Sequence, residues 1–376
     1  MKIATKKFMS IQKGINGRYN FYLPGFFIVL LFFIIADLGC QKDAALSDAP
    51  PDATGYQEID LVADTTCNSA IIDENLKNAW GIAIGPTGAF WVVANQTGLS
   101  TIYDRNGAEL LAPVTIPFNG VPNGGSPTGV IVNTTTDFVI PANQQASKFI
   151  FVAEDGTVTA WSSGSSASTV ADRSSDEAVY KGVAMANDGG QNFLYAANFK
   201  GGSIDVFDKS FNEVTTKPFV DPTIPAGFAP FNIQNIGGML YVTYAKQLGP
   251  DNEDDERGLG NGYVDIFKPD GSFVKRFASN GTLNSPWGMA LAPDGFGLGQ
   301  NMILIGNFGD GKINIYDSNG SYQGQLKDGS TVIAIDGLWE IIFPKNNIPA
   351  GDQNQLFFAA GPDNERHGLF GYIKMR

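Results

Sequence analysis

Two distant stretches of the sequence repeat one another and decide the fold. The first is Ala79-Trp80-Gly81-Ile82-Ala83-Ile84-Gly85-Pro86-Thr87-Gly88, and the second is Pro286-Trp287-Gly288-Met289-Ala290-Leu291-Ala292-Pro293-Asp294-Gly295. Two further apolar segments follow each stretch: 90–95 and 100–104 after the first, 302–307 and 312–317 after the second. Short apolar segments separated by Gly and Pro turns are typical of antiparallel strands. Each stretch therefore predicts a module of three strands, which a fourth would complete.

Weaker copies of this module fill the rest of the chain. Aligned on the residue after the tryptophan or its equivalent, the six copies fall at positions 81, 129, 182, 232, 288 and 340. Such an even period is typical of propellers, in which four-stranded sheets stand round a common axis. We predict an all-β, six-bladed β-propeller with four-stranded blades over residues 56–376. The segment 56–63 precedes the first copy and has no repeat of its own, so we expect it to complete the last blade and close the ring.

Composition limits the classes of function. The chain has 376 residues, with 45 Gly and 20 Pro, which favour many short strands. It carries 25 basic and 38 acidic residues, for a net charge of −13. No basic stripe interrupts this acidic body, so a nucleic-acid partner is not expected. The single histidine, His367, excludes zinc sites built from several histidines.

The N-terminus has the features of an export signal. Residues 26–36 form an unbroken apolar run of 11 residues, shorter than the roughly 20 that span a bilayer. Leu38-Gly39-Cys40 then resembles a lipoprotein cleavage box. We predict a lipoprotein signal peptide over 1–39, a lipidated Cys40 with a flexible tether over 40–55, and a monomeric lipoprotein of a bacterial outer membrane. Ordinary signal cleavage with an incidental Cys40 is the alternative.

Several strings of the body resemble an uncharacterised family of exported bacterial propellers related to NHL repeats. They are Asn78-Ala-Trp-Gly-Ile-Ala, Leu194-Tyr-Ala-Ala-Asn-Phe199, Ala229-Pro-Phe-Asn-Ile-Gln-Asn235, Asn284-Ser-Pro-Trp-Gly288 and His367-Gly-Leu-Phe-Gly371. The resemblance covers residues 57–373 and implies a six-bladed propeller without an assigned activity. The sequence departs from the repeat at Glu340, where the pattern of the other blades would place Gly.

Polar residues recur where the second strand of each module ends. They are Asn95, Glu154, Asn198, Tyr244, Asn307 and Asp363. In NHL-type propellers the turn after the second strand opens beside the central channel, so these residues are expected to form a ring at one mouth. Oxygen ligands of this kind suit Ca²⁺, and the ring resembles, at the level of the fold, the metal site of lactonase-type propellers. Alternatively, the asparagines form the turns themselves.

Two further sites carry charged groups. Asp251, Glu253, Asp254, Asp255 and Glu256 form an acidic loop, interpreted as a solvated loop that projects over one face or as a site that a cation bridges. His367 lies among charged residues and is a weak candidate for a general base, as is Glu154; anchoring a loop is the alternative for His367. Trp80, Trp287 and Trp339 recur at one blade position, which indicates packing between blades.

Two functions follow from these features. The first is a binding module at the cell envelope, which recognises a protein or a glycan through loops on one face. The second is a hydrolase or lactonase that depends on Ca²⁺ held by the polar ring. The sequence contains neither a GxxxxGK[ST] phosphate loop nor a GxSxG nucleophile elbow.

Overall fold

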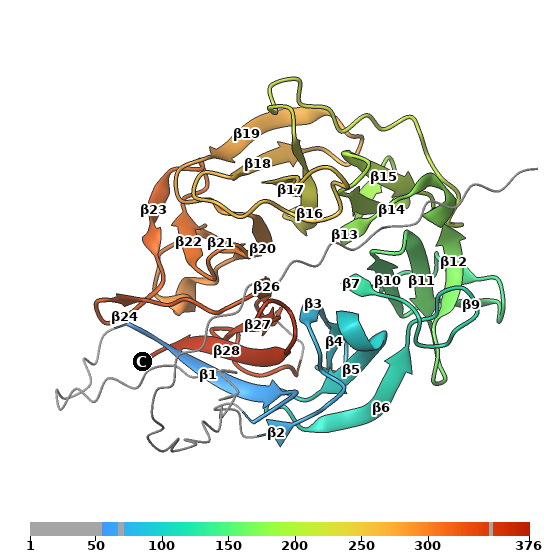
Figure 1. Cartoon of the computed structure of the whole chain (residues 1–376), viewed down its shortest axis with the longest axis horizontal. Helices are drawn as coiled ribbons and strands as arrows, with labels where there is room; N and C mark the ends of the chain where they lie inside the picture. Colours follow the sequence, from blue (N-terminus) through green and yellow to red (C-terminus); the bar gives the residue numbers. More distant parts are fainter. Residues whose placement is uncertain (1–54, 67–70, 346–348) are drawn as a thin grey trace, which may run out of the picture. The chain divides into compact units, whose positions relative to one another are not determined.

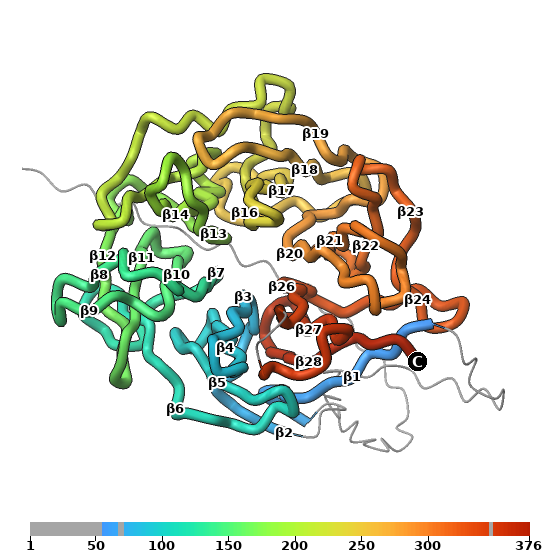
Figure 2. The backbone as a smooth tube through the Cα atoms, turned by 180° about the vertical axis from the view of Figure 1, so that it is seen from behind, coloured from blue at the N-terminus to red at the C-terminus, as the bar shows by residue number. Residues whose placement is uncertain are grey.

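The computed structural model describes residues 55–66, 71–345 and 349–376, which form six sheets round a central channel (Figure 1). The innermost strand of each sheet contacts the innermost strand of the next, and the last contacts the first. The tube view from behind shows the same closed succession from blue to red (Figure 2). The predicted six-bladed propeller is therefore confirmed. The predicted signal peptide and most of the tether, residues 1–54, lie outside the described residues.

Each blade runs from the channel to the rim in sequence order. The first blade is β3 (Ala79–Ile84), β4 (Phe90–Ala94), β5 (Leu99–Tyr103) and β6 (Glu109–Thr115); the second is β7 (Pro127–Val132), β10 (Phe149–Ala153), β11 (Thr157–Trp161) and β12 (Ser168–Asp172). The third is β13 (Tyr180–Asp188), β14 (Gln191–Asn198) and β15 (Ser203–Phe207); the fourth is β16 (Phe228–Ile236), β17 (Met239–Lys246), β18 (Gly262–Phe267) and β19 (Phe273–Ser279). The fifth is β20 (Pro286–Leu291), β21 (Ile303–Asn307), β22 (Ile313–Tyr316) and β23 (Tyr322–Gln325). In the third blade only an isolated bridge between Phe207 and Glu213 stands at the fourth position.

The sixth blade closes the ring as predicted. It consists of β26 (Leu338–Ile342), β27 (Leu356–Ala360), β28 (Leu369–Met375) and the N-terminal strand β1 (Tyr56–Ala63). β1 pairs antiparallel with β28, from Tyr56 opposite Met375 to Ala63 opposite Leu369. A short strand, β2 (Ile71–Ile72), adds to its outer edge in parallel. The two ends of the repeat are thus joined by hydrogen bonds, which leaves no open gap between the first and last blades.

Side chains between neighbouring blades form the core. The second strands are buried on both faces, as in Phe90-Trp-Val-Val-Ala94, because each blade packs against two others. Two small hairpins, β8 (Val139–Ile140) with β9 (Gln145–Ala146) and β24 (Lys327–Asp328) with β25 (Thr331–Val332), lie outside the blades. Among the described residues, no helix is long and apolar enough to cross a bilayer.

Candidate functional site at the channel mouth

One position of the innermost strands lines the channel near its mouth in all six blades. Its occupants are Trp80, Thr128, Lys181, Phe231, Trp287 and Trp339, and all six are buried. Four of them are aromatic, and the fifth is Thr128, whose hydroxyl donates to the carbonyl of Tyr180 at 2.7 Å. Lys181 is the exception, since it places a charge where the other blades place rings or a small hydroxyl.

Lys181 remains charged because carboxylates surround it. Its ammonium bonds to the carboxylate of Glu154, lies 3.6 Å from Asp254 and stands 5.4 Å from the centre of the Trp80 ring. The side chain is 3% exposed. Burial disfavours the ammonium, but the attraction of Glu154 and Asp254 outweighs this cost, so the pKa of Lys181 is raised. A lysine of raised pKa acts as a fixed charge and not as a nucleophile.

Asparagines extend this ion pair into a network across four blades. The Asn95 amide donates to Glu154 at 2.8 Å, and the Asn78 amide donates to Asn95 at 3.4 Å and to Glu365 at 3.1 Å. The network thus runs from the sixth blade through the first and second to Lys181 of the third. We call these residues, together with Asp254, the mouth cluster: Asn78, Asn95, Glu154, Lys181, Asp254 and Glu365.

An unusual turn brings Glu365 to the mouth cluster. Asp363, Asn364 and Glu365 are consecutive residues with positive φ angles of 56°, 53° and 66°. Left-handed conformations are costly for residues other than glycine, and they persist where the surroundings enforce them. Here Gln96 donates its side-chain amide to the Glu365 carbonyl at 2.6 Å. Burial raises the pKa of Glu365, and nearby Lys181 opposes that rise.

Stacked aromatic rings pack beside Lys181 of the mouth cluster. Trp339 lies between Trp80, at 3.6 Å between ring centres, and Phe308, at 3.7 Å, with both pairs nearly parallel. The guanidinium of Arg257 stands 4.3 Å from the Phe308 ring, so the stack has a cation at each end. The packing predicted for the three tryptophans is therefore present: Trp287 meets Trp80 and Trp339 edge to face.

Deeper in the channel, polar side chains meet the free backbone N–H groups of the innermost strands. Glu340 accepts from the N–H of Ile341 at 3.1 Å and from the Gln234 amide at 2.8 Å. Gln234 in turn accepts from the N–H of Met289 at 3.1 Å. Burial raises the pKa of Glu340 to about 8, against the smaller effect of these hydrogen bonds. The departure from Gly at this position therefore places a carboxyl group, largely neutral at pH 7, in the channel.

The predicted acidic loop reaches over the mouth from the fourth blade. The connection between β17 and β18, residues 247–261, contains it, and we call this connection the acidic loop. Glu253 pairs with Lys200 of the third blade at 2.9 Å, and Glu256 pairs with Lys246 at 2.8 Å. Burial raises the pKa of Asp255, while Ser285 and Arg257 act in the opposite direction. Asp251 stays exposed. The loop thus reaches the mouth cluster through Asp254, and its two interpretations, a solvated loop or a site that a cation bridges, stay predictions.

The remaining residues of the predicted ring do not converge on the mouth cluster. The Asn198 oxygen accepts from the N–H groups of Val179 and Gly201, at 3.2 and 3.0 Å. The Asn307 oxygen accepts from the Asn284 N–H at 3.2 Å, and its amide donates to Asp310 at 3.0 Å. These bonds fit the turn-forming interpretation of both asparagines.

Three other predicted residues also face elsewhere. Tyr244 is buried inside the fourth blade, where burial and nearby Asp265 raise its pKa. Asp363 pairs with Arg366 at 2.6 Å. His367 lies 3.2 Å from the Asp64 carboxylate and 3.9 Å from that of Asp363. Since Asp64 directly follows β1, His367 lies where the closing strand ends, the place of a loop anchor.

Residues 55–66, 71–345 and 349–376 contain no group of three or more His, Cys, Asp or Glu that could hold a metal ion. Of the predicted ring, Glu154 and Asn95 lie together, and Lys181 supplies the positive charge beside them. Calcium binding stays a prediction.

Sequence reasoning missed Lys181, Asn78 and Glu365. A signal for Lys181 was present, because it is the one charged residue at a repeat position that otherwise holds Trp, Phe or Thr. The position of Glu365 depends on three consecutive residues in the left-handed conformation, none of them glycine. No pattern in the sequence predicts such a turn.

Comparison with known proteins gave relatives and structural neighbours, while no protein-family model matches the sequence. "Uncharacterized protein R648" of Acanthamoeba polyphaga mimivirus is 36% identical over 325 residues, which cover 83% of this chain and 78% of that protein. "Uncharacterized protein L690" of the same virus is 36% identical over 335 residues, covering 83% of this chain and 84% of that protein. These relatives are viral, whereas the sequence motifs had suggested a bacterial family.

Solved structures share the fold at low identity. A soluble aldose sugar dehydrogenase of Escherichia coli superposes with a TM-score of 0.52 at 15% identity, over 85% of this chain and all of that chain. A streptogramin B lyase superposes with a TM-score of 0.51 at 12% identity, over 85% of this chain and 97% of that chain. At such identities the likeness shows the fold alone. By sequence, the chain belongs to the family of the mimivirus proteins R648 and L690.

Proposed function

We propose that the chain is a binding module that docks a basic protein segment on the face of the propeller around the channel mouth, with no catalysis in the channel. The observation that carries this proposal is the charge of that face. Its six connections between second and third strands hold ten acidic and four basic residues. The acids are Glu154, Asp155, Asp251, Glu253, Asp254, Asp255, Glu256, Asp310, Asp363 and Glu365; the bases are Lys200, Arg257, Lys312 and Arg366.

The connections after the third strands, which lie at the opposite face, carry a smaller net charge. They are residues 104–108, 162–167, 208–212, 268–272 and 317–321, and they hold four acidic and three basic residues. These are Asp104, Asp208, Asp270 and Asp317, with Arg105, Lys209 and Lys268. An excess of one sign on one face steers partners of the opposite sign towards it.

The acidic loop also offers apolar contacts to a partner. Leu248 is 50% and Leu259 77% exposed at its two ends. The loop is held by hydrogen bonds: the Leu248 N–H donates to the Asp254 carbonyl at 2.8 Å, and the Gln247 side-chain amide donates to the Phe199 carbonyl at 2.7 Å. A loop that is already ordered loses little entropy when it binds. Charge around exposed leucines is the usual composition of a protein-binding surface.

A decalysine peptide tests the proposal by calorimetry. The triple variant Asp251→Asn, Glu253→Gln, Asp254→Asn should lose at least about tenfold in affinity, because three exposed charges of the docking face are removed. The control Asp104→Asn, Asp270→Asn, Asp317→Asn removes the same charge from the opposite face and should bind like the wild type. Equal losses in both variants would mean that only net charge matters, and the proposal would then fail.

A location at the bacterial envelope is part of the same proposal. It is supported by the apolar run 26–36 and by the cleavage-like sequence before Cys40. In a bacterial host, an alkyne-tagged fatty acid should label the wild-type chain but not Cys40→Ser, and the variant should leave the membrane fraction. Labelling of both chains, or of neither, contradicts lipidation at Cys40.

The competing hydrolase needs mouth oxygens that are free to bind a metal ion. Glu154 instead bonds to both Lys181 and Asn95, and the aromatic stack packs beside Lys181. Elemental analysis of the purified chain after dialysis separates the two functions. A stoichiometric divalent ion would favour the hydrolase, and its absence is the result expected for the binding module.

A further inference from the structure

The third blade differs from the other five at its outer edge. Each of the other blades has at least four strands, whereas the sheet of the third consists of β13, β14 and β15 (Figure 1). In the fourth blade, for example, β18 pairs with the outer strand β19, and Val264 stands opposite Ala278. Ile204 lies at the same register of β15, opposite Ala197 as Val264 lies opposite Thr243. Within the described residues, no strand pairs with Ile204 on its outer side.

The segment after β15 covers only half of this edge. A bridge joins Phe207 to Glu213, and the Val214 N–H donates to the Val206 carbonyl at 2.8 Å. The backbone groups of alternate residues in a strand point to the same side, so those of Ile204 point outward as the Val206 carbonyl does. Among the residues that the structure describes, no hydrogen bond engages the N–H or the C=O of Ile204. One donor and one acceptor therefore face outward without a partner in this part of the chain.

A third group at this edge lacks the bond that its counterparts make. In the first blade the Gly98 carbonyl accepts from the Ile116 N–H, and in the fourth the Gly262 carbonyl accepts from the Asn280 N–H, both at 2.8 Å. Gly202 holds the same position in the third blade, and no backbone N–H in the described ranges donates to its carbonyl. A Cβ placed on Gly202 would meet nothing within 4 Å. We call the outer side of residues 202–204 the open edge; it offers two acceptors and one donor.

Contacts elsewhere draw the chain away from this edge. Residues 215–216 are exposed, and Lys217 then pairs with Asp188. Pro218 follows, and it packs so closely on a turn of the fourth blade that a Cβ at Gly271 would lie 2.9 Å from the Pro218 nitrogen. Proline also lacks the N–H that a continuing strand would need. The open edge is therefore a product of contacts within the chain itself.

Carboxylates outnumber cations around the open edge. The cations are Arg173 and Lys200, and two carboxylates share each: Asp176 and Glu213 pair with Arg173, and Glu177 and Glu253 pair with Lys200. Three of these carboxylates have side chains that are more than half exposed. Lys200 lies in the turn that leads to Gly202, and its partner Glu253 belongs to the acidic loop. An extended segment of positive charge therefore complements both the backbone groups and the charge of this edge.

We infer that the basic segment proposed for the mouth face continues along the rim of the third blade as its fourth strand, with backbone hydrogen bonds to Gly202 and Ile204. The inference rests on the proposed function, from which it takes the partner, and it adds the conformation in which that partner binds. Addition of a strand to an unpaired sheet edge is a recurrent mode of peptide recognition, in which main-chain hydrogen bonds supply affinity.

Amide hydrogen exchange on the full chain, followed by NMR, tests the inference with a decapeptide of alternating lysine and threonine. Threonine favours an extended backbone, and lysine supplies the charge. At saturating peptide, exchange of the Ile204 amide should slow at least about tenfold, because this amide gains a hydrogen-bond partner. The Val264 amide already faces β19, so it is the internal control and its exchange should not change.

A peptoid with the same side chains separates backbone pairing from charge. It carries the same lysine charges but no backbone N–H, so it cannot donate to the carbonyls of Gly202 and Ile204. In calorimetry it should bind about tenfold more weakly than the peptide, since two hydrogen bonds are lost. Equal affinities of the two ligands would overturn the inference.

The outcomes distinguish this inference from the proposed function. If the peptide binds but Ile204 exchanges as fast as in the free chain, the inference fails and docking on the mouth face stands. If the peptide does not bind, both fail. Slow exchange of Ile204 in the free chain also overturns the inference: residues outside the described ranges would then cover the edge or, where protection grows with protein concentration, a second copy of the chain would.

Discussion

Lys181 at the mouth and Glu340 at the centre of the channel are both buried and both depart from the repeat, but only Lys181 is held in its charged form. At the mouth, Lys181 stands in an aromatic position and keeps its charge, because the carboxylate of Glu154 faces it. In the centre, Glu340 stands in a glycine position without a cation to face, and its pKa rises to about 8. The difference teaches that a buried titratable group in this channel stays ionised only where its counter-charge is also supplied.

The largest expected effect comes from breaking the mouth pair. Lys181→Met keeps the volume but leaves Glu154 without its cation, so we expect the free energy of unfolding to fall by about 3–5 kcal/mol. Urea denaturation followed by tryptophan fluorescence measures this change. Lys200→Met is the control, since Lys200 pairs with the more exposed Glu253, and its loss of stability should be much smaller than that of Lys181→Met. Similar losses in the two variants would show that the mouth pair is not special.

Removing the carboxyl group in the centre should change the pH dependence of stability. Glu340 holds its proton to about pH 8 in the folded chain and to about 4.5 when unfolded. The folded state therefore binds more protons in this window, and the free energy of unfolding falls as pH rises, by at most about 1.4 kcal/mol per pH unit.

Glu340→Gln should remove that slope and leave the chain at least as stable as the wild type at pH 8.5. Denaturation curves from pH 5 to 8.5 give the comparison, with exposed Glu74→Gln as the control. An unchanged slope in Glu340→Gln would mean that the carboxyl group is ionised in the channel.

Asp265 is another buried carboxyl group, and it lies between the two cases because it shares its cation, Arg276, with Asp221. Arg276 bonds to both Asp221 and Asp265, whose side chains are fully buried. Burial raises the pKa of Asp265 to about 7, whereas the pKa of Asp221 is lowered by its bonds to Thr223 and Arg276, which outweigh burial.

Asp265→Asn should therefore flatten the fall in stability from about pH 4 to 7. The effect should be smaller than at Glu340, because Arg276 compensates part of the charge of Asp265. Thermal unfolding at pH 4.5 and 7 measures it. A variant that loses stability equally at both pH values would show that Asp265 is ionised throughout.

The smallest effect is expected at the acidic loop. Its carboxylates at positions 251, 253 and 254 are exposed, and Lys181 keeps its closer partner Glu154 when Asp254 is changed, so the triple variant Asp251→Asn, Glu253→Gln, Asp254→Asn should lose less than about 1 kcal/mol of stability. Urea denaturation measures this loss. A larger loss would mean that the loop supports the fold of the mouth, and the loss of peptide binding in this variant could then not be assigned to the docking face.

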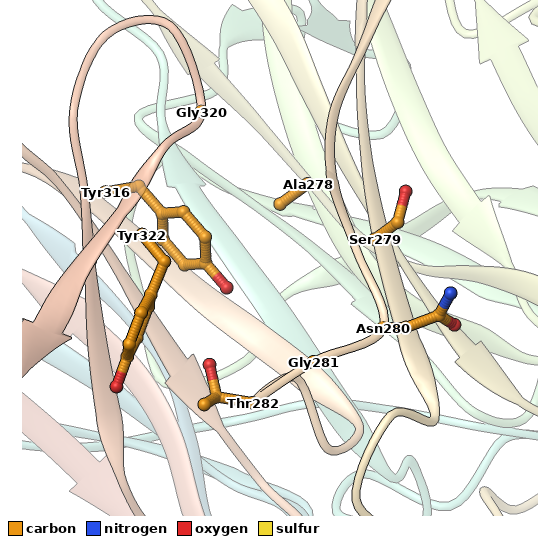
Figure 3. Close-up of a pocket in the computed structure, with 8 residues that line it drawn as sticks. All are labelled: Ala278, Ser279, Asn280, Gly281, Thr282, Tyr316, Gly320 and Tyr322. Carbon is orange, nitrogen blue, oxygen red and sulfur yellow. The ribbon is translucent and has the colours of Figure 1, made fainter.

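The sequence predicted the fold but only part of the site. The repeat predicted six blades, and the unpaired segment 56–63 predicted the closing strand, because both depend on local patterns of apolar residues and turns. Glu154 was expected at the mouth from its place after a second strand. Its partner Lys181 is distant in sequence and meets it only across two blades. The small pocket lined by Tyr316 and Tyr322 (Figure 3) was not expected, because it depends on the close approach of the turn at Gly320 to β19.

Carboxyl-carbon NMR of protein labelled in glutamate tests the account most directly, since it reports the charge of each buried group in the channel. Over pH 4 to 10, one glutamate resonance should titrate near pH 8 and be missing from Glu340→Gln. If every glutamate titrates below about pH 6, as exposed glutamates do, the centre of the channel carries an ionised carboxylate and the account is contradicted.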